Sequence, residues 1–208
     1  MKILCIGRNY AKHAAEMGTA GKLPVWFWKP DSAVIGDGDP VVLPPGIGEV
    51  HHEVELAVRF GMPARRLSAG DALRHLDAFT VAVDVTARDL QAAAKAAGEP
   101  WAMAKGFDTF LPLGAPQPLD VDLQELRLRL ALDGEVRQDG STVDMVRSVP
   151  RLVAEATAWT TMRPGDWLLT GTPEGVGPMR AGQKMLAEVV GHVALRTPVV
   201  DGPAATGP

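Results

Sequence analysis

Two glutamates separated by one residue, Glu53 and Glu55, form the first pair of side chains in the sequence that could do chemistry. They lie in the stretch 51–58, HHEVELAV, where apolar and polar residues alternate with the period of a β-strand. Side chains two apart leave a strand on the same face, about 7 Å from each other. Two ionised carboxylates in that position repel each other unless something lies between them. Three arrangements fit: a solvated strand face, pairing with arginines such as Arg59, or a hard divalent cation such as Mg²⁺ or Mn²⁺.

His13 and Glu16 are three residues apart in a short predicted helix, 10–17, and therefore lie on the same helix face. As a solvated surface pair they would contribute little. Alternatively, the glutamate orients an imidazole that acts as a general base. Asn9 is the predicted N-cap of this helix, and Gly18 is its predicted end.

Asp84 and Lys105 are charged residues in stretches that are otherwise apolar or uncharged. Asp84 falls in the middle of the predicted strand 79–89, FTVAVDVTARD. Its burial requires a partner, which can be a cation, an arginine or a cluster of backbone donors. Lys105, in WAMAKGFD, is either solvated or placed over an anion.

Two more groups of polar residues flank these acids. A helix is predicted at 88–97, and it carries Arg88 and Gln91 near its start. The stretch 166–178, DWLLTGTPEGVGP, predicts a strand that runs into a glycine-rich loop. The loop lacks the lysine and the hydroxyl residue that close a Walker motif. Its backbone N–H groups and the Thr172 hydroxyl could still bind a carboxylate.

Short strands and turns make up most of the remaining chain, because apolar residues alternate with polar ones between clusters of glycine and proline. Strands are predicted at 2–6, 25–30, 126–132, 185–190 and 193–200, helices at 68–77 and 148–161, and a hairpin turn at Asp133-Gly134.

Length and composition fit one globular domain. The chain has 208 residues, of which 46% are hydrophobic and 22% are charged, which is sufficient to bury a core. We expect a single catalytic domain over residues 1–200 and a disordered tail over residues 201–208. The net charge of −4 provides no basic surface for nucleic acid or an anionic membrane, and no apolar run is long enough to span a bilayer. The first residues indicate a strand rather than a signal peptide. The single cysteine, Cys5, excludes an internal disulfide and fits a cytoplasmic location.

Four stretches together resemble the fumarylacetoacetate hydrolase family. They are CIGRNYAKHAAEMG, FWKPDSAV followed by VHHEVELAV, VDVTARDLQ and LLTGTPEGVGP, and the resemblance extends over residues 3–195. The match is to the small single-domain branch, which includes acylpyruvases, fumarylpyruvate hydrolases, oxaloacetate decarboxylases and isomerase/decarboxylases. It implies an α+β, β-rich fold, a mixed β-sheet roll with short peripheral helices, usually as a homodimer. The chain departs from the family pattern at Trp28 and at Gln183-Lys184. The resemblance therefore does not predict the distal group of the substrate or the structure of the local sheet edge.

The resemblance also implies a role for each polar residue singled out above. It assigns Glu53, Glu55 and Asp84 to Mg²⁺ or Mn²⁺, His13, Glu16 and Lys105 to catalysis, and Arg88, Gln91 and Thr172 to substrate binding.

These roles imply a metal-dependent hydrolase that cleaves a carbon–carbon bond in acylpyruvate-type 2,4-dioxo acids, such as fumarylpyruvate, to pyruvate and a carboxylic acid. A 2-oxo acid can chelate a metal through its carboxylate and carbonyl oxygens, and the metal and Lys105 would stabilise the pyruvate enolate. One alternative is an oxaloacetate decarboxylase or a 2-hydroxyhepta-2,4-diene-1,7-dioate isomerase/decarboxylase. Another is an idle protein that only binds metal and dicarboxylate. The His13–Glu16 pair argues against the idle protein, since a pure binder needs no water activator.

Overall fold

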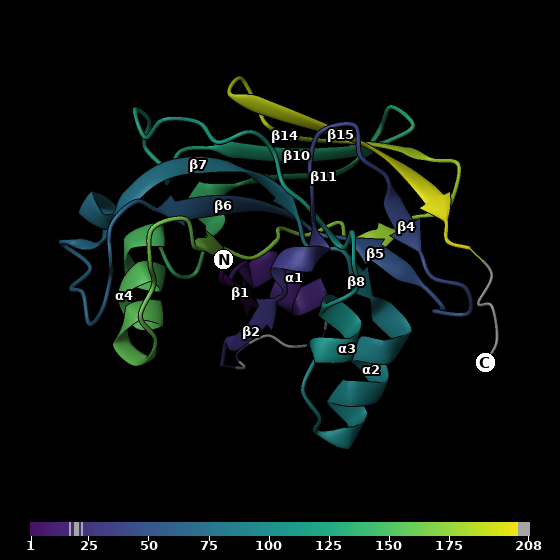
Figure 1. The fold of residues 1–208 in the computed structure, drawn as a ribbon, viewed down its shortest axis with the longest axis horizontal. Helices are drawn as coiled ribbons and strands as arrows, with labels where there is room; N and C mark the ends of the chain where they lie inside the picture. The colour runs from purple at the N-terminus through teal and green to yellow at the C-terminus, as the bar shows by residue number, and fades with distance from the viewer. Residues whose placement is uncertain (17, 19–20, 22, 204–208) are drawn as a thin grey trace.

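Two five-stranded β-sheets form the body of the protein (Figure 1). The structure is a computed structural model that describes residues 1–16, 18, 21 and 23–203. The first sheet has the order β2 (Val25–Lys29), β1 (Ile3–Gly7), β12 (Trp167–Leu169), β6 (Val54–Phe60) and β7 (Leu76–Val83). The second has the order β11 (Glu135–Ser141), β10 (Arg127–Leu132), β14 (Lys184–Val189), β15 (Val193–Asp201) and β4 (Val41–Leu43). Each sheet mixes one parallel pair, β1 with β12 or β15 with β4, with antiparallel pairs. The predicted β-rich fold with mixed sheets is therefore confirmed.

Smaller sheets and short helices surround this body. One small sheet contains β13 (Gly177–Pro178), β5 (Val50–His52) and β8 (Thr86–Ala87), and another pairs β3 (Val34–Ile35) with β9 (Leu111–Pro112). The α-helices are α1 (Ala11–Glu16), α2 (Arg88–Ala97), α3 (Ala102–Lys105) and α4 (Val149–Trp159), and the 3₁₀ helices are η1 (Asp31–Ala33), η2 (Ala72–His75) and η3 (Thr142–Asp144). In the described part of the chain, no helix has the length and hydropathy needed to cross a membrane.

The main hydrophobic core lies between the two sheets, where β10, β14 and β15 contact β6 and β7. The alternating apolar residues of β6 point into it: Val54, Leu56 and Val58 are fully buried. The opposite face of β6 is also covered, by a second cluster that includes Ala57 and Cys5. Glu55 lies on this second face, so it is buried even though it points away from the main core.

Both predicted strands that carry the acids are interrupted at the acids themselves. Glu53 separates β5 from β6, and Asp84 follows the end of β7 rather than lying in the middle of a strand. At the break before β6, Val54 N donates to the side chain of Gln138 instead of to a neighbouring strand, while the bond from Asp84 N to Glu53 O at 2.8 Å still holds the two acids side by side. The continuous strands predicted at 51–58 and 79–89 are corrected accordingly.

Of the four predicted helices, two match the structure, the first begins one residue later than predicted, and one does not form. Helix α2 covers 88–97 as predicted and ends at Gly98, whose φ of 72° is typical of a left-handed C-terminal residue. Helix α4 lies within the predicted 148–161. The helix predicted at 68–77 is wrong: only η2 forms there, and Leu76 already pairs with Phe60 in the β6–β7 ladder.

The ends of the chain differ in part from expectation. Helix α1 begins at Ala11, and the Asn9 side chain does not cap it. Asn9 instead bonds to Thr170 O and to the backbone of Arg147. Strand β15 extends to Asp201, into the stretch predicted as tail, because residues 199–201 pair with β4. Residues 204–208 and residue 17 lie outside the described part of the chain, so the predictions made for them are not tested.

Candidate active site and metal centre

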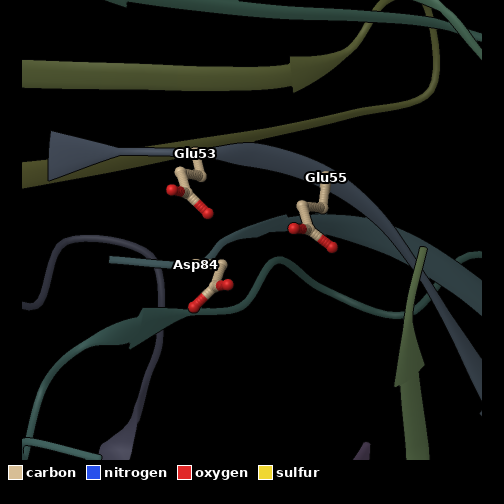
Figure 2. A group of neighbouring side chains, drawn as sticks. All are labelled: Glu53, Glu55 and Asp84. Atoms are coloured by element: carbon tan, nitrogen blue, oxygen red, sulfur yellow. The ribbon is translucent and has the colours of Figure 1, made fainter. Parts of the chain in front are cut away.

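Three carboxylates, those of Glu53, Glu55 and Asp84, converge at the broken strand ends (Figure 2). Each offers an oxygen within 4.8 Å of the others, and all three residues are buried. The β6–β7 register explains the convergence, because Val54 pairs with Val83 and so sets Glu53 and Asp84 next to each other. Glu55 lies on the same face of the chain as Glu53, as the strand pattern predicted.

The donor set fits a hard divalent cation. Glu55 forms no ion pair with a described residue, and Gly171 N donates to it at 2.7 Å. Burial raises the pKa of the Glu55 carboxyl well above its usual range, and Asp84 and Glu53 raise it further. Asp84 Oδ1 is buried, and the Lys29 ammonium lies 2.9 Å from it. A cation bound to these oxygens would relieve the repulsion at Glu55, and oxygen ligands of this kind suit Mg²⁺ or Mn²⁺.

Lys105 is bonded directly to two of the three acids. Its ammonium donates to Glu53 Oε2 at 2.9 Å, to Asp84 Oδ2 at 2.5 Å and to Thr86 Oγ1 at 2.6 Å. Burial alone would lower the pKa of Lys105, but the Asp84 and Glu53 carboxylates hold it above its usual value. The interpretation of Lys105 as a solvated lysine is therefore wrong, and the lysine lies over anions.

Lys29 is a second buried ammonium in the site, and the sequence did not single it out. It donates to Lys105 O at 2.6 Å, to Phe110 O at 2.9 Å and to Val85 O at 3.0 Å, and its Nζ lies 2.9 Å from Asp84 Oδ1. Burial lowers the pKa of Lys29, against the effect of Asp84. The sequence VWFWKP contains an indication of this burial, because Lys29 lies on the same strand face as Phe27.

Arg88 and Gln91 stand at the start of α2 and border the acids. Arg88 donates to Glu53 Oε1 at 2.6 Å and to Gln91 Oε1 at 2.7 Å. Lys95, one turn further along α2, donates to the same Gln91 oxygen at 3.0 Å. Because both partners of that oxygen can only donate, the Gln91 amide nitrogen must face the other way. Sequence reasoning also missed Lys95. Its position four residues after Gln91 indicates that the two side chains lie on the same face of the helix.

His13 and Glu16 meet on α1, with His13 Nδ1 3.4 Å from Glu16 Oε2. His13 is buried and lines the same pocket as the three acids, which excludes a fully solvated pair. Glu16 lies behind it, and both of its carboxylate oxygens lie 3.3 Å from Gly175 N in the glycine-rich loop. Since Nδ1 faces Glu16, Nε2 is the ring nitrogen left to react with a substrate.

One pocket collects almost all the residues that the sequence predicted for the site. Its lining includes His13, Glu53, Glu55, Asp84, Arg88, Gln91, Lys105 and Thr172, together with Arg8, Lys95 and Trp101. Glu16 is absent from the lining but contacts His13. The three acids are equalled in number by the cations Lys29, Lys105 and Arg88, which pair with Asp84 and Glu53 and not with Glu55. A divalent cation, together with Arg8 and Lys95 in the lining, would therefore leave the pocket with an excess of positive charge.

Comparisons with known proteins identify the family of this chain. The family described as fumarylacetoacetate (FAA) hydrolase C-terminal matches residues 2–200. A mitochondrial oxaloacetate tautomerase of Arabidopsis thaliana is 47% identical over 91% of this chain and 86% of its own. The oxaloacetate tautomerase YcgM of Escherichia coli is 41% identical over 92% of this chain and 89% of its own. A fumarylpyruvate hydrolase of Pseudomonas aeruginosa, solved in complex with Mn²⁺ and pyruvate, superimposes with a TM-score of 0.92 at 34% identity, covering 97% of this chain and 90% of that one. With a family match over nearly its whole length, the chain belongs to the fumarylacetoacetate hydrolase family.

Proposed function

We propose that this protein is a divalent-metal-dependent enzyme that interconverts the keto and enol forms of oxaloacetate or a closely related 2-oxo dicarboxylate. The observation that carries the proposal is the charge of the pocket. Three cations equal the three carboxylates in number, so a bound divalent ion, with Arg8 and Lys95 in the lining, leaves an excess of positive charge that favours a dicarboxylate. The similarity to two oxaloacetate tautomerases supports the same substrate class.

This proposal replaces the first expectation drawn from the sequence. Hydrolysis of acylpyruvates is less well supported than the alternative of an oxaloacetate decarboxylase or isomerase, because the two curated relatives above are named as oxaloacetate tautomerases. Keto–enol interconversion requires a proton to move at the carbon next to the 2-oxo group. It does not require an attacking water.

The donors that line the pocket can orient such a substrate. The Gln91 amide N–H and the Thr172 hydroxyl are placed to donate to the carboxylate next to the 2-oxo group. Lys95, which pairs with no described carboxylate, is placed to bind the distal carboxylate. These three residues offer donors, and a dicarboxylate offers only acceptors.

In the proposed reaction His13 transfers a proton and Lys105 stabilises negative charge. Mg²⁺ or Mn²⁺, bound by Glu53, Glu55 and Asp84, would polarise the 2-oxo group as a Lewis acid. His13 Nε2 accepts a proton from the carbon next to the 2-oxo group, and the electron pair of that C–H bond forms the carbon–carbon double bond of the enol. The imidazolium that results is stabilised by Glu16 at Nδ1. Lys105 opposes the negative charge that develops on the carbonyl oxygen, and a proton from solvent completes the enol.

A second candidate is the hydrolysis of acylpyruvates, with His13 activating a water. Two observations favour it: the His13–Glu16 contact itself, and the similarity to the fumarylpyruvate hydrolase that binds Mn²⁺ and pyruvate. The same donors would hold an acylpyruvate through its 2-oxo acid end.

The test is a direct comparison of substrates. Metal-loaded protein is given freshly dissolved enol-oxaloacetate, and the loss of enol absorbance is followed against a blank with Mg²⁺ alone. Pyruvate release from oxaloacetate and from fumarylpyruvate is measured in parallel. We expect the enol signal to decay faster than in the blank, and treatment with a chelator to abolish the difference. Equal decay with and without protein would overturn the proposal, and pyruvate release from fumarylpyruvate alone would establish the hydrolase.

We also propose that the protein forms a homodimer in the cytoplasm, as the sequence led us to expect. Light scattering on the purified protein tests the first statement, and fractionation of the source cells tests the second.

A further inference from the structure

Gln138 is a buried glutamine on a strand edge that none of the catalytic roles includes. It lies in β11 and is only 1% exposed, whereas Val136, two residues before it, is 50% exposed. Residues two apart share a face in a regular strand, so the strand must be irregular here. The register shows the reason: Leu130 pairs with Gln138 and Ala131 with Val136, which leaves Arg137 as the extra residue of a β-bulge. The bulge turns the Gln138 side chain inward.

Both the oxygen and the nitrogen of the Gln138 amide make hydrogen bonds. Its Oε1 lies 3.0 Å from Val54 N and 2.9 Å from His52 Nδ1. Its Nε2 donates to Thr172 Oγ1 at 2.8 Å and to Pro173 O at 3.1 Å. A backbone N–H can only donate and a backbone carbonyl can only accept, so Val54 and Pro173 fix which end of the amide is oxygen.

This orientation determines two proton positions next to the active site. His52 must carry a proton on Nδ1, because its partner there is an acceptor. The Thr172 oxygen must accept from Gln138, so the Thr172 hydroxyl proton has to point elsewhere. Thr172 lines the pocket that contains the three acids, and a substrate carboxylate there can accept that proton.

The backbone around Gln138 is packed tightly against the glycine-rich loop. A Cβ on Gly175 would lie 2.3 Å from Arg137 O, and a Cβ on Gly140 would lie 2.5 Å from Cβ of Pro173. Gly175 also has a φ of +87°, which L side chains rarely adopt. Strand β11 therefore holds the loop in place at the same point where Gln138 bonds to it.

We propose that Gln138 is a positioning residue that turns the Thr172 hydroxyl toward the substrate and ties the glycine-rich loop to the chain between Glu53 and Glu55. This inference deepens the proposed function and rests on it for the identity of the substrate. Gln138 acts through Thr172 and touches no reacting atom.

The first test uses the parent protein and does not depend on turnover. Nitrogen-15 NMR of the His52 ring distinguishes the two neutral tautomers, and we expect the proton on Nδ1. A proton on Nε2 alone would mean that Gln138 presents its amide the other way round, and the proposal would be overturned.

The second test is a double-mutant cycle between Gln138→Met and Thr172→Val. Gln138→Met keeps the length of the side chain but removes its hydrogen bonds. Each single substitution should lower kcat/KM for oxaloacetate by ~10-fold or more, mainly through KM, as expected for one lost hydrogen bond to a charged group. The double variant should be no worse than about 2-fold below Thr172→Val, because residues that act as a unit are not additive. Multiplicative losses would show that Gln138 does not act through Thr172.

Gln138→Glu provides a variant that keeps the acceptors for His52 and Val54. A carboxylate there takes the Thr172 proton for itself, so this variant should show the same KM effect even if Gln138→Met fails to fold. Gln117→Met is the matched control, since among the described residues the Gln117 side chain bonds only to Ala115 O, and Gln117 is not part of the pocket lining. It should behave like the parent.

Two binding measurements separate this inference from the proposed function. Mn²⁺ affinity should be unchanged in Gln138→Met, because all three carboxylates and the charge of the site are kept, and a loss as large as the KM effect would place Gln138 in the metal centre instead. Pyruvate affinity of the Mn²⁺-loaded proteins should follow the same non-additive cycle. If the parent turns over no 2-oxo acid but pyruvate binding follows the cycle, the proposed function fails and the role of Gln138 is retained.

Discussion

Replacing Lys29 by methionine should destabilise the fold more than replacing any exposed lysine. The substitution keeps the length and apolar stem of the side chain but removes the buried ammonium. Val85 O, Lys105 O and Phe110 O then lose their donor, and Asp84 loses an ion-pair partner at 2.9 Å. None of these acceptors can turn to water, because Lys29 and Asp84 are fully buried.

The size of the effect follows from these contacts. Removing one partner of a buried ion pair costs about 3–5 kcal/mol, and a buried carbonyl left without a donor costs about 1–3 kcal/mol. Neighbouring groups will relax, so we expect a total of about 4 kcal/mol or more rather than the full sum. With a urea dependence of about 2 kcal/mol per molar for a domain of this size, the unfolding midpoint should fall by about 2 M.

The assay is equilibrium unfolding in urea with a chelator present, so that the metal does not contribute. Lys184→Met is the control, because Lys184 is exposed and pairs with no described carboxylate; it should stay within about 0.5 kcal/mol of the parent. A loss below about 1 kcal/mol for Lys29→Met would refute the reasoning, since it would mean that the ammonium is dispensable to Asp84 and to the three carbonyls.

Three further outcomes test the site. Glu55→Gln should keep the fold but weaken Mg²⁺ or Mn²⁺ binding by ~10-fold or more, measured by calorimetry, because one charged ligand is lost at nearly constant shape; unchanged affinity would remove Glu55 from the ligand set. His13→Ala should lower the rate of enol–keto exchange by ~10²-fold with metal affinity unchanged, and an unaltered kcat would contradict a general base. Lys95→Met should raise KM for oxaloacetate by ~10-fold but leave KM for the monocarboxylate phenylpyruvate alone, and equal effects on both would show that Lys95 does not read the second carboxylate. Partial burial and Arg88 lower the pKa of Lys95 to about 8, with Lys105 and Arg8 adding to the decrease and Glu53 opposing it. Lys95 therefore loses its charge above that pH. KM for oxaloacetate should rise between pH 7 and pH 9 in the parent but not in Lys95→Met.

The sequence predicted the parts of this protein that depend on local pattern. Alternation in HHEVELAV placed Glu53 and Glu55 on one face, and the helix carrying Arg88 and Gln91 was predicted to the residue. The resemblance to a family then indicated which polar residues belong together. The structure brings them to one pocket, while their individual roles stay predictions.

The features that sequence reasoning missed depend on contacts between distant parts of the chain. The break at Glu53 requires a hydrogen bond from Val54 N to a glutamine 84 residues away. The burial of Lys29 requires carbonyl oxygens that are 56 to 81 residues further along. The β-bulge that turns Gln138 inward is invisible in a stretch, EVRQDGS, whose residues read as an exposed edge strand. Local periodicity carries no information about such partners.

The cations that contact the carboxylates in the site have a consequence for how a metal would be acquired. In proteins whose ligands have no other counter-charge, metal binding drives folding and the apoprotein is unfolded. Here Lys29, Lys105 and Arg88 already balance the acids, so the chain can complete its fold before metallation. The proposed ion would then enter a finished pocket and could exchange there. The concentrations of Mg²⁺ and Mn²⁺ around the folded protein would therefore decide which of them occupies the site, and not events during its synthesis.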